Sequence, residues 1–207
     1  MVIGSVNIKK TRIGVCCIVF SVMLGLTLTL TFQITNNMKK SIIDHLQTIT
    51  EERSKVIENY IEYAEQMLTH YSKAGEITNV LEHPEDEEAL EKAQYYTESY
   101  SKDIIGLEGI YVSDWDMRVR AHSNPGIIGF VTREGISLKN FRNSILAVGD
   151  GVYNYGIINS PASGQQVISF VKGIYNEEGL SIGVVGIALY SSKLVSILSD
   201  FTRKNEN

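Results

Sequence analysis

The sequence predicts an α+β fold in which one transmembrane helix and one long helix precede a five-stranded antiparallel sheet. Three observations lead to this prediction. A charge-free apolar stretch lies near the N-terminus, a helical spacing of apolar residues follows it, and short strand-like segments separated by turn residues fill the second half. A chain of 207 residues, of which 43% are hydrophobic, suffices for one packed domain in addition to an anchor.

The apolar stretch covers residues 13–34 and contains no charged residue. It exceeds the roughly 20 residues that a helix needs to cross the hydrocarbon core of a bilayer. A cleaved secretory signal is the alternative, but it requires small residues at its cleavage site, and the first alanine of the chain is Ala64. We therefore expect an uncleaved transmembrane helix in the lipid bilayer of the cell membrane.

The charges on either side of this stretch indicate its orientation. Lys9, Lys10 and Arg12 precede it without any acidic residue, which favours a cytoplasmic tail at residues 1–12 and an extracytoplasmic remainder. Lys39 and Lys40 follow the stretch and weaken this bias.

Residues 37–74 are predicted to form one long helix, because apolar residues recur at alternating spacings of three and four and no Pro or Gly occurs before Gly75. This apolar seam consists of Ile42, Leu46, Ile49, Val56, Tyr60, Tyr63 and Met67. The spacing is typical of a coiled coil, and two copies would form a homodimer through it. An amphipathic helix that covers its own domain has a similar spacing, and the sequence leaves both readings open.

The remaining segments are predicted from turn residues and from changes of period. We expect a break at 75–84, helices at 85–102, 138–148 and 191–203, a loop at 124–137, and strands at 109–113, 117–122, 152–158, 167–175 and 182–190. Consecutive hairpins at both ends of this order predict an antiparallel sheet covered by helices on one face.

Several classes of function are disfavoured by composition and by missing motifs. The net charge of −5 and the lack of a basic stripe argue against a nucleic-acid partner. Both cysteines, Cys16 and Cys17, lie in the apolar stretch, and the sequence has no P-loop, dinucleotide fingerprint, H-E-x-x-H or G-x-S-x-G motif. We therefore expect no enzyme, no metal site and no cofactor.

One predicted strand carries an unusual density of polar side chains. Strict alternation would put Arg118, Arg120 and His122 on one face, and Arg133 in the following loop could close over the same place. Arginine offers a planar fork for carboxylates, and histidine adds a donor. The alternative is an exposed edge strand with its charges in water.

Three tyrosines on predicted strands, Tyr111, Tyr153 and Tyr155, either line a pocket or fill a half-buried sheet surface. Ser169 and Lys172 fall on opposite faces of one strand, so at most one of them points at any pocket.

Two blocks of the sequence resemble a known family. Residues 111–135 (YVSDWDMRVRAHSNPGIIGFVTREG) and 146–194 resemble the Cache family of extracytoplasmic sensor domains, as in bacterial methyl-accepting chemotaxis receptors and related transmembrane sensors. The most telling pieces are H-S-N-P at 122–125, Gly129, T-R-E-G at 132–135 and G-V-V-G-I-A-L at 183–189. The resemblance covers residues 35–200.

The resemblance implies a single PAS-like Cache domain, with a small-molecule pocket between the sheet and the loop after the second strand. It implies dimerisation through the long helix and a position between two membrane helices, so that residues 201–207 would begin a second span or form a tail. Whether the chain is a fragment or a complete orphan sensor stays open.

The implied function is that of an extracytoplasmic small-molecule sensor region of a transmembrane signalling protein, in the first place a chemoreceptor. The alternatives are the sensor region of a histidine kinase or diguanylate cyclase, and a ligand-independent, membrane-anchored dimerisation or partner-binding protein.

The sequence departs from the family's ligand-binding patterns at three positions. Citrate and dicarboxylate sensors of this type carry an arginine where Val119 stands and a second arginine where Ser169 stands. Amino-acid sensors carry an aspartate near Ala188. The expected ligand is therefore a small molecule, such as an organic acid or another anionic metabolite, whose identity the resemblance does not supply.

Overall fold

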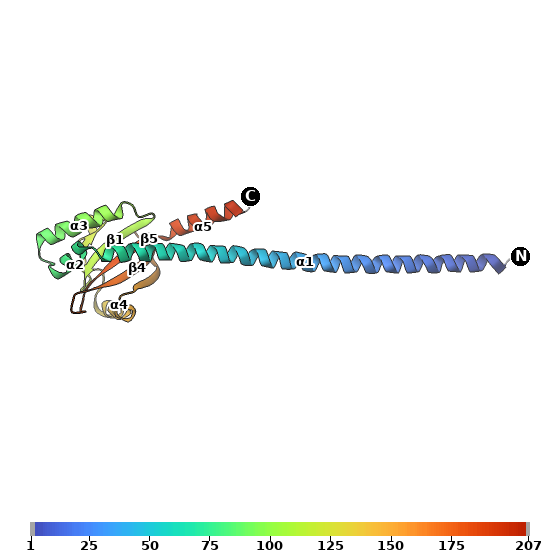
Figure 1. Ribbon diagram of the computed structural model, residues 1–207, viewed down its shortest axis with the longest axis horizontal. Helices are drawn as coiled ribbons and strands as arrows, with labels where there is room; N and C mark the ends of the chain where they lie inside the picture. Colours follow the sequence, from blue (N-terminus) through green and yellow to red (C-terminus); the bar gives the residue numbers. More distant parts are fainter. Residues whose placement is uncertain (1–2, 206–207) are drawn as a thin grey trace. The chain divides into compact units, whose positions relative to one another are not determined.

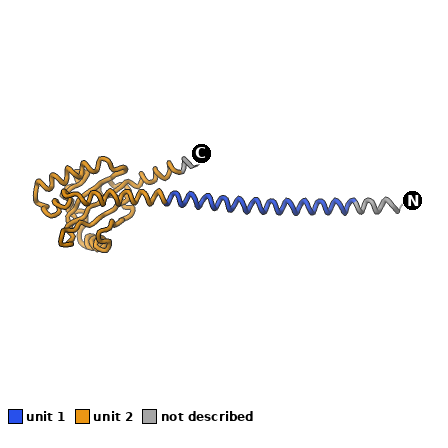
Figure 2. The backbone as a smooth tube through the Cα atoms, viewed as in Figure 1, with its two compact units in different colours: residues 1–54 blue, residues 55–207 orange. Residues whose placement is uncertain are grey.

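The computed structural model describes residues 3–205, and the chain divides into two units, residues 1–54 and 55–207 (Figure 2). In chain order the elements are α1 (Ile3–Ser72), α2 (Gly75–Glu82), α3 (Glu87–Ser101), β1 (Leu107–Asp114), β2 (Val119–His122), the 3₁₀ turn η1 (Pro125–Ile127), α4 (Gly135–Val148), β3 (Val152–Asn159), β4 (Gln166–Tyr175), β5 (Ser181–Tyr190) and α5 (Ser191–Asn205) (Figure 1).

The first unit is helical throughout its described part and contains the apolar stretch. Within the described chain, one helix is long and apolar enough to cross a membrane, judged by length and composition alone, and its apolar window lies near the N-terminus. The hydroxyls in the stretch donate to carbonyls one turn earlier, as Ser21 does to Cys17 and Thr31 to Thr27, both at 2.8 Å. These side chains consequently need no water partner.

The second unit is built around the predicted five-stranded antiparallel sheet, which is confirmed. Its strand order is β2-β1-β5-β4-β3, and each neighbouring pair is antiparallel. β5 therefore lies at the centre, between β1 and β4. No residue separates the end of β5 at Tyr190 from the start of α5 at Ser191.

One face of the sheet is covered by the C-terminal part of α1 together with α2 and α3 (Figure 1). The core between them contains Leu68 and Tyr71 from α1, Val80 from α2, and Phe170 and Ile187 from the sheet, all with no solvent exposure. Buried apolar side chains at a spacing of three and four on the helix, and at a spacing of two on the strands, are what holds this layer together.

The apolar seam of the long helix divides into two parts. Tyr60, Tyr63 and Met67 pack against the domain's own core, as expected of an amphipathic helix. Ile42 and Leu46, which belong to the first unit, are exposed by 55% and 57%. The helix prediction is confirmed, although α1 begins well before residue 37 and ends at Ser72.

The other face of the sheet corrects the prediction of helices on one face only. Phe141 and Ile145 of α4 are buried there against Val171 of β4, Val184 of β5 and Met117. α4 covers one end of this face, where Tyr153 of β3, Val171 of β4 and Val184 of β5 lie. The other end of the same strands, with Val167 and Ala188, is left to a different set of residues.

Two segments predicted to lack regular structure contain short elements. The expected break at 75–84 holds α2, because Ile77, Val80 and Leu81 recur at helical spacing and all three are buried. Gly75, taken as a helix breaker, is instead the first residue of α2. The loop expected at 124–137 holds η1, a bridge between Val131 and Arg118, and the start of α4 at Gly135.

Candidate functional site

A cavity of about 470 Å³ lies on the sheet face that α4 leaves uncovered. Its apolar lining comes from Val119, Ile127, Phe130, Val131, Ile158 and Val167. Its polar lining comes from Glu108, Tyr111, His122, Thr132, Arg133, Ser160 and Ser169. This volume and this mixture of apolar walls with a few polar groups are typical of small-molecule sites.

His122 is fixed at the end of β2 by its own backbone and by α3. Gln94 accepts a hydrogen bond from the His122 amide at 3.0 Å and donates one to its carbonyl at 2.9 Å. The imidazole Nδ1 accepts from the amide of Asn124 at 2.8 Å. The neutral ring therefore carries its proton on Nε2, which leaves Nε2–H as a donor at the cavity.

Burial lowers the pKa of His122 below its ordinary value, and the nearby carboxylate of Glu108 opposes this shift. The accepting role of Nδ1 agrees with this direction, because a protonated ring would present a second donor to the Asn124 amide.

Two glycines allow aromatic rings to lie against the sheet. A β-carbon on Gly186, the β5 partner of Tyr111, would collide with the Tyr111 ring. A β-carbon on Gly109 would lie 2.9 Å from Cε1 of His122. Both rings thus lean in the same direction across the sheet, Tyr111 over β5 and His122 over β1. Their planes are parallel within 6°, with centroids 6.1 Å apart.

Arg133 supplies the cavity's cation. Its guanidinium carbon lies 4.4 Å from the ring centroid of Phe141 and 4.8 Å from that of Tyr155, and its Nη1 donates to the Tyr155 hydroxyl at 3.3 Å. Among the described side chains, no carboxylate lies within ion-pair distance of Arg133. The two rings hold the cation in place while most of its donors stay unused.

Tyr111 responds to the same cation. Burial raises the pKa of its phenol, and the charge of Arg133 partly offsets that rise. All four residues, Arg133, Tyr111, Glu108 and His122, line the same cavity.

The carboxylate of the cavity is held by the loop after β3. Ser160 donates to Glu108 at 2.6 Å, and its hydroxyl accepts from the amide of Ala162 at 3.1 Å. The cavity consequently contains both an anionic group, Glu108, and a cationic group, Arg133.

The structure brings together four of the eight residues expected from the sequence. Tyr111, His122, Arg133 and Ser169 line the cavity. Tyr155 lies outside the lining but holds Arg133, and Tyr153 packs with the core under α4.

Arg118 and Arg120 correct the expectation of one shared face with His122. The register between β1 and β2 shifts between Val112 and Ser113, so β2 carries an extra residue there. Val119, not Arg118 or Arg120, lines the cavity. Arg120 instead binds Asp114 at 2.8 Å and the carbonyl of Pro84, whereas Arg118 is exposed and donates to the carbonyl of Gly129.

Glu108, Thr132 and Ser160 were not expected in the lining. Glu108 is the residue at a second register shift, between Leu107 and Gly109, so alternation along β1 does not place it. Ser160 follows β3 and belongs to a loop whose course the sequence pattern does not define. The cluster of turn-forming residues at 159–164 (NSPASG) was the available signal of a turn there.

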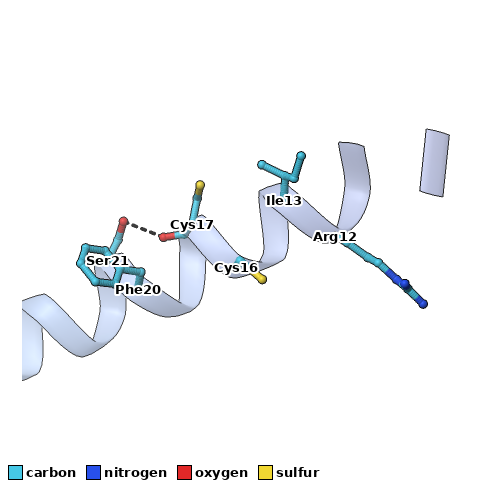
Figure 3. Close-up of a pocket in the computed structure, with 6 residues that line it drawn as sticks. All are labelled: Arg12, Ile13, Cys16, Cys17, Phe20 and Ser21. Carbon is cyan, nitrogen blue, oxygen red and sulfur yellow. Dashed lines mark hydrogen bonds between the residues drawn. The ribbon is translucent and has the colours of Figure 1, made fainter. Parts of the chain in front are cut away.

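Two other hollows lack the features of this cavity. The hollow shown in Figure 3 lies along α1 at residues 12–21 and is bounded by side chains of this single helix, including Cys16 and Phe20, so nothing encloses a ligand. The other, of about 280 Å³, contains Lys172, whose ammonium group is already bound by Asp150 at 2.6 Å. That hydrogen bond and charge lower the pKa of Asp150.

The geometry above is that of a known class of fold. No family model matches the sequence, and no curated protein matches it either. The structure, however, has the fold of Cache-type, PAS-like sensor domains, in agreement with the prediction from the sequence.

The similar structures come from several kinds of signalling protein. One is the sensor domain of the histidine kinase DctB from V. cholerae, with a TM-score of 0.60 and 17% identity over 75% of this chain and 58% of that chain. Another is the sensory domain of the Campylobacter jejuni chemoreceptor Tlp3 with isoleucine bound, with a TM-score of 0.62 and 17% identity over 79% of this chain and 65% of that chain. A third is the Tlp3 ligand-binding domain in complex with L-valine, with a TM-score of 0.60 and 16% identity over 79% of this chain and 65% of that chain. The chain thus spans 58–65% of the length of these structures.

Proposed function

We propose that this chain is the small-molecule-sensing region of a membrane signalling protein and that its cavity binds a carboxylate-bearing ligand. The observation that carries the proposal is Arg133, a cation held between two aromatic rings in a cavity, with no carboxylate partner among the described side chains. Arg133 is half-buried, and a guanidinium whose donors are mostly unused gains free energy when an anion completes its hydrogen bonds.

The rest of the cavity defines the other requirements on the ligand. Glu108 calls for a donor group on the ligand, and the apolar walls call for a hydrocarbon or aromatic body. The similar sensor domains with isoleucine and L-valine bound support a small ligand that carries a carboxylate.

The proposal places residues 13–34 across the cell membrane, the tail 1–12 in the cytoplasm and the domain 35–200 outside the cell. Ligand binding would bias the position of the helices that enter and leave the domain, to the extent that the ligand binds one arrangement more tightly than the other. Homodimerisation through the exposed part of the apolar seam belongs to the proposal. No catalytic step does.

The output of the signal is proposed to be that of a chemoreceptor. A histidine kinase or diguanylate cyclase output is compatible with the same sensor domain, since the similar structures include domains of a histidine kinase and of a putative sensory box/GGDEF family protein.

The test is calorimetric titration of the full chain in lipid nanodiscs with a library of small carboxylates. Arg133→Gln should weaken binding of any ligand found by about 10-fold to 100-fold, as expected for loss of a charge-assisted hydrogen bond. Arg118→Gln is the matched control, because this arginine is exposed and outside the lining, and it should bind like the unchanged chain. Absence of any carboxylate ligand, or equal binding by the Arg133 variant, would contradict the proposal.

A further inference from the structure

The floor of the cavity is formed by two aromatic rings in parallel planes. Tyr111 and His122 are direct partners across β1 and β2, and both lean toward the centre of the sheet. Side chains at Gly186 and Gly109 would occupy the space of these rings, so the absence of two β-carbons produces the arrangement.

Two rings that lie in parallel planes on the floor of a cavity favour a flat ligand. Aromatic groups gain roughly 0.5–1.5 kcal/mol from offset stacking beyond the area they bury, and a puckered saturated ring cannot make the same contact. Ile127, Phe130 and Val131 line the cavity from the segment after β2 and add apolar contacts.

Two charged groups line the cavity together with these rings. They are Arg133 and Glu108, and the Nε2–H of His122 is a further donor. A planar ring over the floor can therefore present a carboxylate to Arg133 and a ring substituent or ring nitrogen to Glu108 or His122.

We infer that the preferred ligand is an aromatic or heteroaromatic carboxylic acid, stacked on Tyr111 and His122 with its carboxylate at Arg133. This inference rests on the proposed function, because it takes the carboxylate at Arg133 as given and adds the shape of the body. A cavity of this kind should prefer aromatic acids to aliphatic acids of similar size.

The experiment compares acids that differ only in ring saturation. Benzoate is paired with cyclohexanecarboxylate, and 2-naphthoate with its decahydro derivative, in titrations of the full chain in nanodiscs at neutral pH. Each pair has the same charge and nearly the same size. The aromatic member should bind about threefold to tenfold more tightly.

Two variants and one control locate the preference. Tyr111→Leu should remove it and leave both members at the affinity of the saturated acid. Gly186→Ala should also remove the preference, because its β-carbon would displace the Tyr111 ring. Gly186 itself is not part of the lining. Tyr95→Leu is the control, because Tyr95 is 74% exposed on α3, and it should keep the preference.

The outcomes are distinguishable. If every saturated acid binds as tightly as its aromatic twin, or if only aliphatic amino acids bind, the planar ligand is ruled out and the carboxylate sensor stands. If no carboxylate binds the unchanged chain, both proposals are overturned. If the Tyr111 variant misfolds, the test rests on the unchanged chain and the Gly186 variant, in each of which the aromatic and saturated acids are compared.

Discussion

His122 shows how much of this site depends on hydrogen bonds to the backbone. Four of its neighbours act on it: Gln94 fixes its amide and carbonyl, Asn124 fixes Nδ1, Gly109 makes room for its ring, and Tyr111 lies parallel to it. A residue so constrained contributes one defined donor, Nε2–H, to the cavity. Its burial also lowers its pKa, because burial disfavours the charged imidazolium.

This constraint predicts how stability depends on pH. The folded pKa of His122 lies below the unfolded value of about 6.5, so at pH above ~7.5 the ring is neutral in both states. As pH falls through about 6.5, the unfolded chain takes up a proton that the folded chain refuses. The free energy of unfolding should then decrease, by at most about 1.4 kcal/mol per pH unit.

Thermal unfolding between pH ~7.5 and ~5.5 measures this effect. His122→Gln should flatten the dependence, while His83→Gln, which changes an exposed histidine, should leave it intact. An unchanged slope in the His122 variant would assign the dependence to other groups.

Single residues also show where sequence reasoning stops. Tyr111 and Ser169 line the cavity, and Ser169 lies on the face of β4 opposite to Lys172, as the alternation of side chains along a strand predicts. Arg118 and Arg120 were not placed correctly, because one extra residue in β2 changes which side chains face the cavity, and no residue type marks this bulge in the sequence. Glu108 and Ser160 meet across 52 positions of chain, which a periodic pattern cannot reveal.

At the scale of elements, α1 combines two different helical surfaces. Its C-terminal turns are part of the domain core, with Leu68 completely buried. In the first unit the same spacing of apolar residues continues, but Ile42 and Leu46 remain exposed. The sequence predicted the helix and its seam correctly, but it could not tell which turns belong to the core, because both surfaces have the same period.

Two leucines of α1 should therefore respond in opposite ways. Leu68→Ala should lower the free energy of unfolding by about 2–5 kcal/mol, because it leaves a cavity in the core. Leu46→Ala should change it by less than about 0.5 kcal/mol, since Leu46 is 57% exposed.

If the exposed seam joins two copies, Leu46→Ala should affect dimerisation more than Leu68→Ala does. Leu46→Ala should then weaken the dimer of the full chain in sedimentation velocity experiments, whereas Leu68→Ala should leave the dimer constant unchanged under folding conditions. A monomeric unchanged chain would remove the dimer from the proposal.

The whole molecule was more predictable than its site. The order of elements, the antiparallel hairpins and the α+β class follow from apolar periodicity and turn residues, which are local signals. The missed α2 is instructive, since Gly75 was taken as a breaker and stands at a helix start, where its freedom costs little. The placement of α4 on the second face depended on contacts that only the folded chain defines.

The proposed topology can be measured with one introduced thiol. In a background of Cys16→Ser and Cys17→Ser, an Asn154→Cys variant carries its thiol at an exposed position of β3. A membrane-impermeant maleimide should label it on intact cells, because the domain is proposed to lie outside.

Asn7→Cys in the same background is the control, and it should be labelled only after the cells are lysed. The reverse pattern would place the domain in the cytoplasm and contradict the proposed orientation.

The direct passage from β5 to α5 has a mechanical consequence. β5 carries Gly186 beneath the Tyr111 ring and Ala188 at the cavity, and it ends at Tyr190, whose carbonyl lies 3.5 Å from the hydroxyl of Tyr60 on α1. No flexible linker intervenes before α5 starts at Ser191. A displacement of β5 would therefore pass directly to α5, and through the Tyr60–Tyr190 hydrogen bond it would also reach α1.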